Sequence, residues 1–179
     1  MKPLLILLLC MGFVAPLAKR KLVADKSLST VTYSAKHPLH KWDGVSHDVN
    51  CALIYNDESK QPESVAVSIK VASFDSDNNN RDSHAMEVLE GLKYPNVTFT
   101  SNDIKADENG QLVARGTLTF HGVARSITLP VMRRESGGKL TLTGEFPVSM
   151  TDYKVERPSL MGLKTDDELI LKINAVFTL

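Results

Sequence analysis

Residues 112–131 read LVARGTLTFHGVARSITLPV, and this stretch decides the fold class. Apolar or small residues occupy every second position from Leu112 to Phe120, and polar residues such as Arg115 and Thr117 fill most positions between them. A period of two is typical of an antiparallel strand with one face on a core and the other in water. A His-Gly-Val turn then interrupts the pattern, and a second strand is expected near residues 126–133.

The same alternation recurs along most of the chain from residue 28 onward. Gly137-Gly138 and Asn109-Gly110 separate alternating runs and are predicted turns. We therefore predict an all-β domain of about eight short, mostly antiparallel strands, near residues 30–35, 45–54, 65–71, 97–100, 112–120, 126–133, 140–146 and 169–178.

One segment departs from this period. From Asp82 to Leu92, apolar residues recur at helical spacing, with Asp82 or Ser83 as the N-cap and Gly91 near the C-terminal end. A helix this short is unstable alone in water, so we expect it to pack on the sheet.

Eight antiparallel strands form either a sandwich or a closed barrel, and alternation alone does not separate the two. Small residues in the middle of three inward faces, namely Ala114, Gly116, Gly144 and Ala175, favour a barrel with a hollow. The alternative is that they only permit the strands to bend.

The first eighteen residues differ in kind from the rest. Lys2 is followed by an apolar run from Leu4 to Val14 and by small, turn-prone residues up to Ala18. This pattern predicts a secretory signal peptide over residues 1–18, a single mature domain over residues 19–179, and a periplasmic or secreted location. An uncleaved N-terminal anchor is the alternative. Equal numbers of basic and acidic residues, 21 of each, give no reason to expect binding to nucleic acid or stable insertion into a membrane after cleavage.

The residues offer little support for catalysis or a metal site. Asp75, Asp77 and Asn79 match the start of a calcium-binding EF-hand loop, but the loop needs Gly where Asn80 stands and Glu where Met86 stands. Five histidines, His37, His40, His47, His84 and His121, leave a metal site open without any recognised ligand spacing. Cys51 lies in an alternating strand, which favours an inert core thiol over a reactive one.

Three segments together resemble one family. They are SFDSDNNNRDSHAMEVLEGLKYPNVTFTS at 73–101, GTLTFHGVARSITLPV at 116–131 and the ending DELILKINAVFTL. They are similar to the YceI-like proteins of bacteria, and the resemblance runs from about Asp25 to the C-terminus. The segment YSAKHPLHKWDGV matches the family's histidine before a turn at His37. Leu28 departs from the pattern, because the family commonly has a histidine there.

The resemblance implies an eight-stranded, lipocalin-like antiparallel barrel with one short helix, and a bound amphiphile such as a polyisoprenoid, a prenylated quinone or a fatty amide. It implies no catalysis and no cofactor, and a homodimer is one option. The expected ligand-binding residues are Tyr33, His37, Val67, Ile69, Arg81, His84, Phe99, Leu118, Phe120 and His121. Arg81 has an alternative role, pairing with Asp75 or Asp77 to fix the helix. A histidine-dependent metalloenzyme of the cell envelope and a purely structural domain are the alternative functions.

Overall fold

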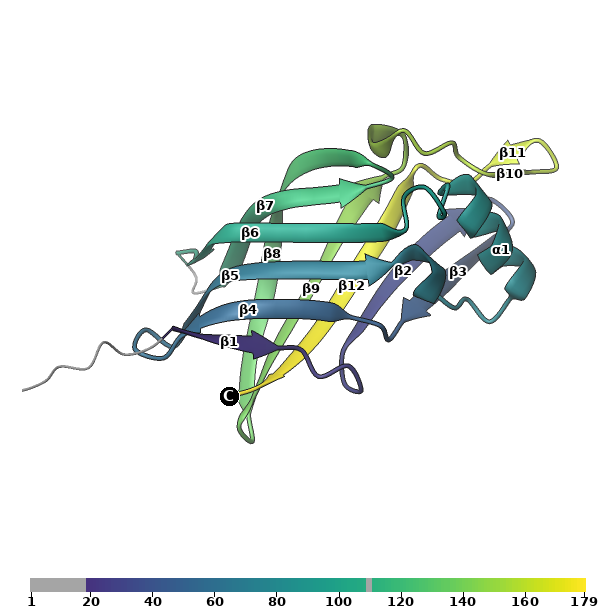
Figure 1. The fold of residues 1–179 in the computed structure, drawn as a ribbon. Coiled ribbons are helices and arrows are strands. Elements are labelled where there is room, and N and C mark those ends of the chain that lie inside the picture. The colour runs from purple at the N-terminus through teal and green to yellow at the C-terminus, as the bar shows by residue number, and fades with distance from the viewer. Residues whose placement is uncertain (1–18, 109–110) are drawn as a thin grey trace, which may run out of the picture.

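The fold is one strongly curled antiparallel sheet with a helix over one end (Figure 1). The computed structural model describes residues 19–108 and 111–179. The signal-peptide prediction for residues 1–18 and the predicted Asn109-Gly110 turn lie outside these residues. Ten strands follow the order β1-β4-β5-β6-β7-β8-β9-β12-β2-β3, and β10 and β11 form a separate hairpin. The strands are β1 (Lys19–Val23), β2 (Thr30–His37), β3 (His40–Ser46), β4 (Asn50–Asn56), β5 (Gln61–Lys70), β6 (Asn96–Ala106), β7 (Leu112–Phe120), β8 (Val123–Ser136), β9 (Lys139–Ser149), β10 (Ser159–Leu160), β11 (Leu163–Lys164) and β12 (Glu168–Thr178).

The all-β, lipocalin-like class is confirmed, but the count of eight strands is wrong. The strand β1 was not predicted, because its three basic residues give no alternation of apolar and polar positions, but it pairs with β4. The expected strand at 45–54 is two strands, β3 and β4, separated by residues 47–49. The hairpin of β10 and β11 is too short to leave a period in the sequence. The inward positions of β7 were predicted correctly. Every second residue from Leu112 to Phe120 is buried, except Gly116, which is half-buried.

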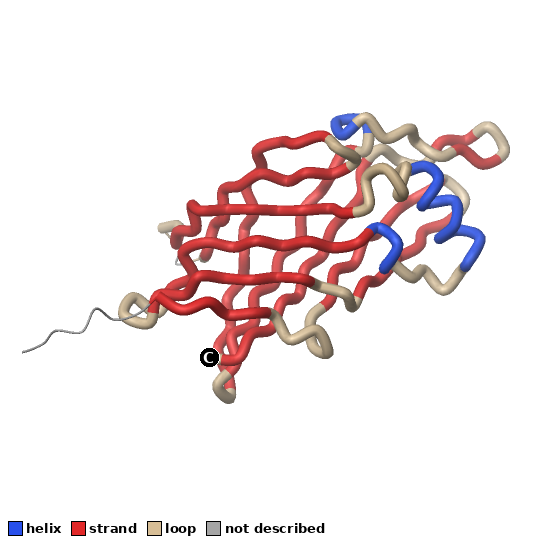
Figure 2. The backbone as a smooth tube through the Cα atoms, in the orientation of Figure 1, coloured by secondary structure: helices blue, strands red, loops and turns tan. Residues whose placement is uncertain are grey.

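The helix α1 (Asn79–Val88) begins three residues before its expected start. Its N-cap is Asn78, whose side chain accepts a hydrogen bond from the Arg81 N–H at 3.0 Å. The predicted cap, Asp82 or Ser83, is wrong, because both residues lie within the helix. Asp82 lies in the first turn, where a carboxylate is stabilised by the positive end of the helix dipole. Short 3-10 turns, Val71–Ser73 and Thr151–Tyr153, complete the helical segments, which gather at the end of the sheet away from the C-terminus (Figure 2).

The curled sheet has a seam, because β1 and β3 stand at opposite ends of the strand order. Two isolated bridges close it. At one end of the molecule Ala24 pairs with Phe177 of β12. At the other end Val45 pairs with Asp75, and their backbones exchange N–H···O bonds of 2.8 and 3.0 Å.

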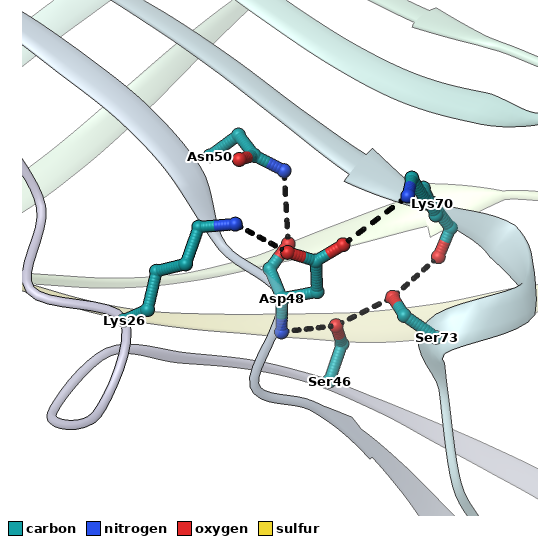
Figure 3. Close-up of polar contacts among 6 residues, drawn as sticks. All are labelled: Lys26, Ser46, Asp48, Asn50, Lys70 and Ser73. Atoms are coloured by element: carbon teal, nitrogen blue, oxygen red, sulfur yellow. Dashed lines mark hydrogen bonds and ion pairs between the residues drawn. The ribbon is translucent and has the colours of Figure 1, made fainter.

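The connection at residues 47–49 crosses this seam and is pinned by polar contacts (Figure 3). The Asp48 carboxylate pairs with Lys26 at 2.6 Å and with Lys70 at 3.8 Å. The Lys26 hydrogen bond lowers the pKa of Asp48 below its usual range. Ser46 Oγ lies 2.7 Å from Ser73 Oγ, which in turn donates to the carbonyl of Lys70. These contacts hold β3 against the end of β5.

The apolar core divides into two clusters along the axis of the curled sheet. The first lies at the end near the C-terminus and includes Leu53, Tyr55, Leu140 and Phe177, which are at most 1% exposed. The second surrounds Leu118, Phe120 and Tyr153 and includes many half-buried residues. Side chains therefore fill one end of the molecule more completely than the other.

Within the described part of the chain, every helix is too short or too polar to cross a membrane.

Ser29 provides a test of the closed end of the seam. Its side chain is fully buried, and its hydroxyl accepts the Val176 N–H at 3.0 Å. Ser29→Ala leaves that N–H buried without a partner, so we expect unfolding free energy to fall by about 1–3 kcal/mol. Urea denaturation measures this loss, with Ser136→Ala at an exposed site on β8 as the control. Equal stability of the two variants would contradict the role given to Ser29.

Candidate ligand-binding site

A cavity of about 360 Å³ lies beneath α1, at the end of the curled sheet that side chains leave unfilled. Its volume falls within the range of small-molecule sites, about 300–1,000 Å³. Most of its lining is apolar. The walls come from β2, β5, β6, β7, β9 and β12, through residues such as Val31, Ile69, Val97, Leu118, Phe120, Val148, Leu169 and Leu171.

Helix α1 covers this cavity without burying any of its own residues. Arg81, Asp82, Ala85 and Val88, together with Leu89 just after the helix, line the cavity and recur with the spacing of one helical face. All five are half-buried rather than buried. Val88 and Leu89 pack against the second core cluster, but this face of α1 also borders the cavity. A surface helix normally buries its apolar stripe fully on a core, so the incomplete burial here marks the cavity.

The N-terminal end of α1 places charge at the rim of the cavity. Asp82 accepts hydrogen bonds from the Ser76 hydroxyl at 2.6 Å and from the Ser76 N–H at 3.2 Å. Arg81 donates to the Ser76 carbonyl at 3.1 Å, and its guanidinium lies 5.3 Å from the centre of the Trp42 ring. The suggested pairing of Arg81 with Asp75 or Asp77 is replaced by this contact with Trp42, since these described residues form no such ion pair.

Tyr33 forms part of the wall because a glycine lies beside it. Tyr33 on β2 is paired with Gly44 on β3, and a Cβ at Gly44 would lie only 2.3 Å from the Tyr33 ring. The ring also meets Phe74 edge-on, with a centroid distance of 5.5 Å. Burial raises the pKa of the Tyr33 hydroxyl, so this group stays protonated and uncharged at neutral pH.

His37 lines the cavity but is only 3% exposed, and both of its ring nitrogens form hydrogen bonds with backbone groups of neighbouring segments. Nδ1 accepts the N–H of Leu39 at 3.2 Å, which leaves Nε2 as the donor to the carbonyl of Leu163 at 2.9 Å. His40 and His84 line the same cavity and are exposed at its rim. His84 Nδ1 lies 3.4 Å from the Glu87 carboxylate, and the His40 ring lies 5.1 Å from the Trp42 ring, measured between centroids.

Val67 and Phe99, two of the expected ligand-binding residues, line a second cavity of about 70 Å³ deeper in the sheet. On four strands, one inward-facing residue lines the outer cavity and the next inward-facing residue along the strand lines the inner cavity. The pairs are Ile69 and Val67 on β5, Val97 and Phe99 on β6, Val148 and Phe146 on β9, and Leu171 and Ile173 on β12. The two cavities therefore lie end to end, and the buried residues Phe99 and Phe146 stand at the boundary between them.

The small inward residues do not create the main hollow. Ala114, Gly144 and Ala175 line only the inner cavity. Gly116 permits close packing instead, because a Cβ there would lie 2.2 Å from the Thr100 carbonyl and 2.7 Å from the Phe99 ring. The large cavity results from a gap between α1 and the sheet, which no single-strand pattern reveals.

His121 lies outside both cavities. It occupies the turn between β7 and β8 with φ of 49°. Nε2 lies 3.0 Å from the Glu90 carboxylate, and Nδ1 lies 3.1 Å from the Tyr153 carbonyl. The ring also meets Tyr94 edge-on at 4.8 Å. These contacts join the turn to the segment after α1, so the structure gives His121 a structural position.

Several residues that line the outer cavity were not predicted from the sequence. Trp42, the single tryptophan, and Phe74, Met150 and Thr165 all line the outer cavity. Trp42 and Gly44 lie on the same face of β3, of which the predicted strand at 45–54 included only the last two residues. The alternation of Trp42 and Gly44 with polar residues is the signal that could have identified Trp42 as inward-facing. Met150 and Thr165 lie in irregular segments, where no period points to an inward side chain.

The described residues contain no group of three or more His, Cys, Asp or Glu side chains placed to hold a metal ion. The histidine-dependent metalloenzyme therefore finds no support in this part of the chain.

A family comparison agrees with the geometry. The model of the YceI-like domain matches residues 22–177. The chain belongs to the YceI-like family. Protein YceI of Salmonella newport (strain SL254) is 29% identical over 168 residues, which are 89% of this chain and 87% of that protein. Protein YceI of Escherichia coli O6:H1 is 30% identical over 102 residues, or 55% of this chain and 53% of that protein.

Two solved structures share the fold of this YceI-like chain. BcnA of Burkholderia cenocepacia has a TM-score of 0.76 at 23% identity and covers 86% of this chain and 98% of its own. A polyisoprenoid binding domain from Saccharophagus degradans, implicated in plant cell wall breakdown, has a TM-score of 0.65 at 13% identity. That match covers 90% of this chain and 99% of the Saccharophagus domain. At these identities the likeness concerns the fold alone.

Cys51 allows a test of how closed the inner cavity is. Its side chain lines that cavity, and burial raises the pKa of the thiol to about 12. A thiol reagent needs the thiolate, so we expect no labelling of the folded Cys10→Ser variant at pH 8 and one equivalent in denaturant. Ellman's reagent measures both. Fast labelling of the folded variant would show that the cavity is open to solutes.

Proposed function

We propose that the protein binds a long amphiphilic lipid of isoprenoid type in the curled sheet, as a carrier or reservoir, without converting it chemically. The observation that carries this proposal is the unfilled cavity beneath the half-buried apolar face of α1. The side chains that line the cavity are mostly apolar and border its empty space, so an apolar ligand chain can contact them directly. The neighbouring fold of a polyisoprenoid binding domain agrees with the same ligand class.

The energetics favour such a ligand. Each buried methylene contributes about 0.8 kcal/mol, so about ten of them supply the ~8 kcal/mol of micromolar binding before ordering costs. Tyr33, Ile69, Leu118 and Phe120 contact the chain in this proposal, and Val67 and Phe99 contact its far end. The polar head lies at the rim near Arg81 and His84. A periplasmic or secreted location, following removal of residues 1–18, is part of the proposal and fits a lipid carrier of the cell envelope.

Mass spectrometry of an organic extract of the purified protein tests the proposal directly. We expect an isoprenoid-type lipid in the wild type and at least tenfold less in Ala85→Trp, because an indole on the inner face of α1 fills the cavity. Ala66→Trp, on the exposed outer face of β5, is the matched control and should retain the lipid. Circular dichroism checks the fold of both variants. A wild-type extract without lipid would overturn the proposal.

The passage between the two cavities should set the length of the bound chain. Phe99→Leu widens this passage and should raise the affinity for prenols longer than those that the outer cavity holds, by about tenfold for each 1.4 kcal/mol gained. Phe120→Leu is the control, because it enlarges the outer cavity without opening the passage. Competition binding over a series of prenol lengths distinguishes them. A shared length profile in both variants would exclude a role for the Phe99 ring.

A further inference from the structure

The hairpin of β10 and β11 projects at the same end of the sheet as α1 (Figure 1). Its tip is apolar and exposed, and Ser159 and Leu160 line the cavity. Leu160, Met161 and Leu163 are 51%, 85% and 44% exposed. Met161 and Gly162 both have positive φ, 54° and 79°, which gives the tight turn that projects the tip. A single exposed apolar residue needs no explanation, but three in one turn do.

Leu39, in the turn between β2 and β3, joins this group and is 59% exposed. One imidazole links the two turns, because His37 contacts the Leu39 N–H and the Leu163 carbonyl. Leu39, Leu160, Met161 and Leu163 together form an apolar corner. The described residues expose eight large apolar side chains in all, so half of them gather at this corner.

The apolar corner is held rigidly, so its exposure is a built feature of the fold. An isolated two-stranded hairpin is marginally stable in water and needs additional contacts. Here the Thr165 N–H donates to the Pro158 carbonyl at 2.8 Å, and Arg157 Nε donates to the Thr165 carbonyl at 2.8 Å. The Asp166 N–H donates to the Lys36 carbonyl at 2.7 Å, which ties the base of the hairpin to β2.

The apolar corner is continuous with the cavity, because Leu160 belongs to both the exposed tip and the cavity lining. Cations flank it. Lys41 and Lys164 are exposed, and Lys36 pairs with Asp166 at 3.0 Å. Exposed apolar side chains beside lysines are the composition of segments that rest in the interface of an anionic bilayer.

We propose that the apolar corner docks on an anionic lipid surface and places the cavity mouth against it, so that the ligand passes between bilayer and cavity without crossing water. The contact is peripheral, with Met161 and its neighbours at the depth of the headgroups. This docking proposal rests on the proposed function, because only a lipid ligand would need a continuous apolar path from the exposed tip at Leu160 into the cavity. A protein partner or a second copy would use the same apolar area but not its continuity with the cavity.

An environment-sensitive fluorophore tests the docking itself. In a Cys10→Ser background, Met161→Cys labelled with a nitrobenzoxadiazole dye should shift to the blue on vesicles of one part phosphatidylglycerol to three parts phosphatidylethanolamine. Met132→Cys, exposed on β8 away from the corner, is the control and should not shift. Lys41→Glu combined with Lys164→Glu should weaken the shift at least fivefold on these vesicles. An equal response at residues 161 and 132, or none at 161, overturns the proposal.

A transfer assay connects docking to function. Met161→Glu should slow the transfer of bound lipid to acceptor vesicles at least tenfold, while the lipid extracted from the purified variant stays at the wild-type amount. If no lipid is found in any extract but the label at 161 still shifts, the ligand proposal fails and the docking stands. If Met161→Glu instead abolishes a concentration-dependent dimer in the absence of vesicles, the corner is a contact between copies and the docking proposal is wrong.

Discussion

In the described part of the chain, two isolated backbone bridges and a few polar contacts join the edges of the curled sheet, and the rest of the structure depends on where they lie. The bridge of Ala24 with Phe177 closes one end, where large side chains fill the interior. The bridge of Val45 with Asp75 joins the other end just before α1 begins. Because this second bridge fixes the segment that leads into the helix, it also fixes where the helix lies over the sheet.

The cavity follows from that arrangement. Helix α1 is fixed at its N-terminal end by its contacts to Ser76 and by Arg81 on Trp42. At its other end Val88 and Leu89 pack against the second core cluster without being fully buried. A helix anchored at its polar end can leave part of its inner face beside a cavity. Apolar surface that stays accessible in this way is unfavourable in water and becomes favourable once an apolar ligand covers it. Stability and binding are therefore linked through the same half-buried side chains.

The site could be predicted in part, and the success has a clear limit. Ile69, Leu118 and Phe120 were found because strand alternation assigns each residue to a face, and the inward face of a curled sheet surrounds its interior. Val67 and Phe99 have the same parity but lie one step deeper, and alternation does not say how far along the axis a residue lies. Trp42 and Met150 were missed because they lie in a strand and a segment that the patterns did not delimit. His121 was placed correctly in a turn, but sequence does not say toward which neighbours that turn folds.

By itself the sequence determined the class of fold, the inward set of each long strand, one short helix and the family, because these depend on local period and on motifs that lie within single segments. Only the tertiary structure decided that the hollow lies beneath α1 instead of beside the small residues Ala114 and Gly144. It also brought Leu39 to the hairpin around Met161, and it placed both at the mouth of the cavity. These features depend on distances between segments far apart in the chain, and the spacing of residues within one segment carries no record of them.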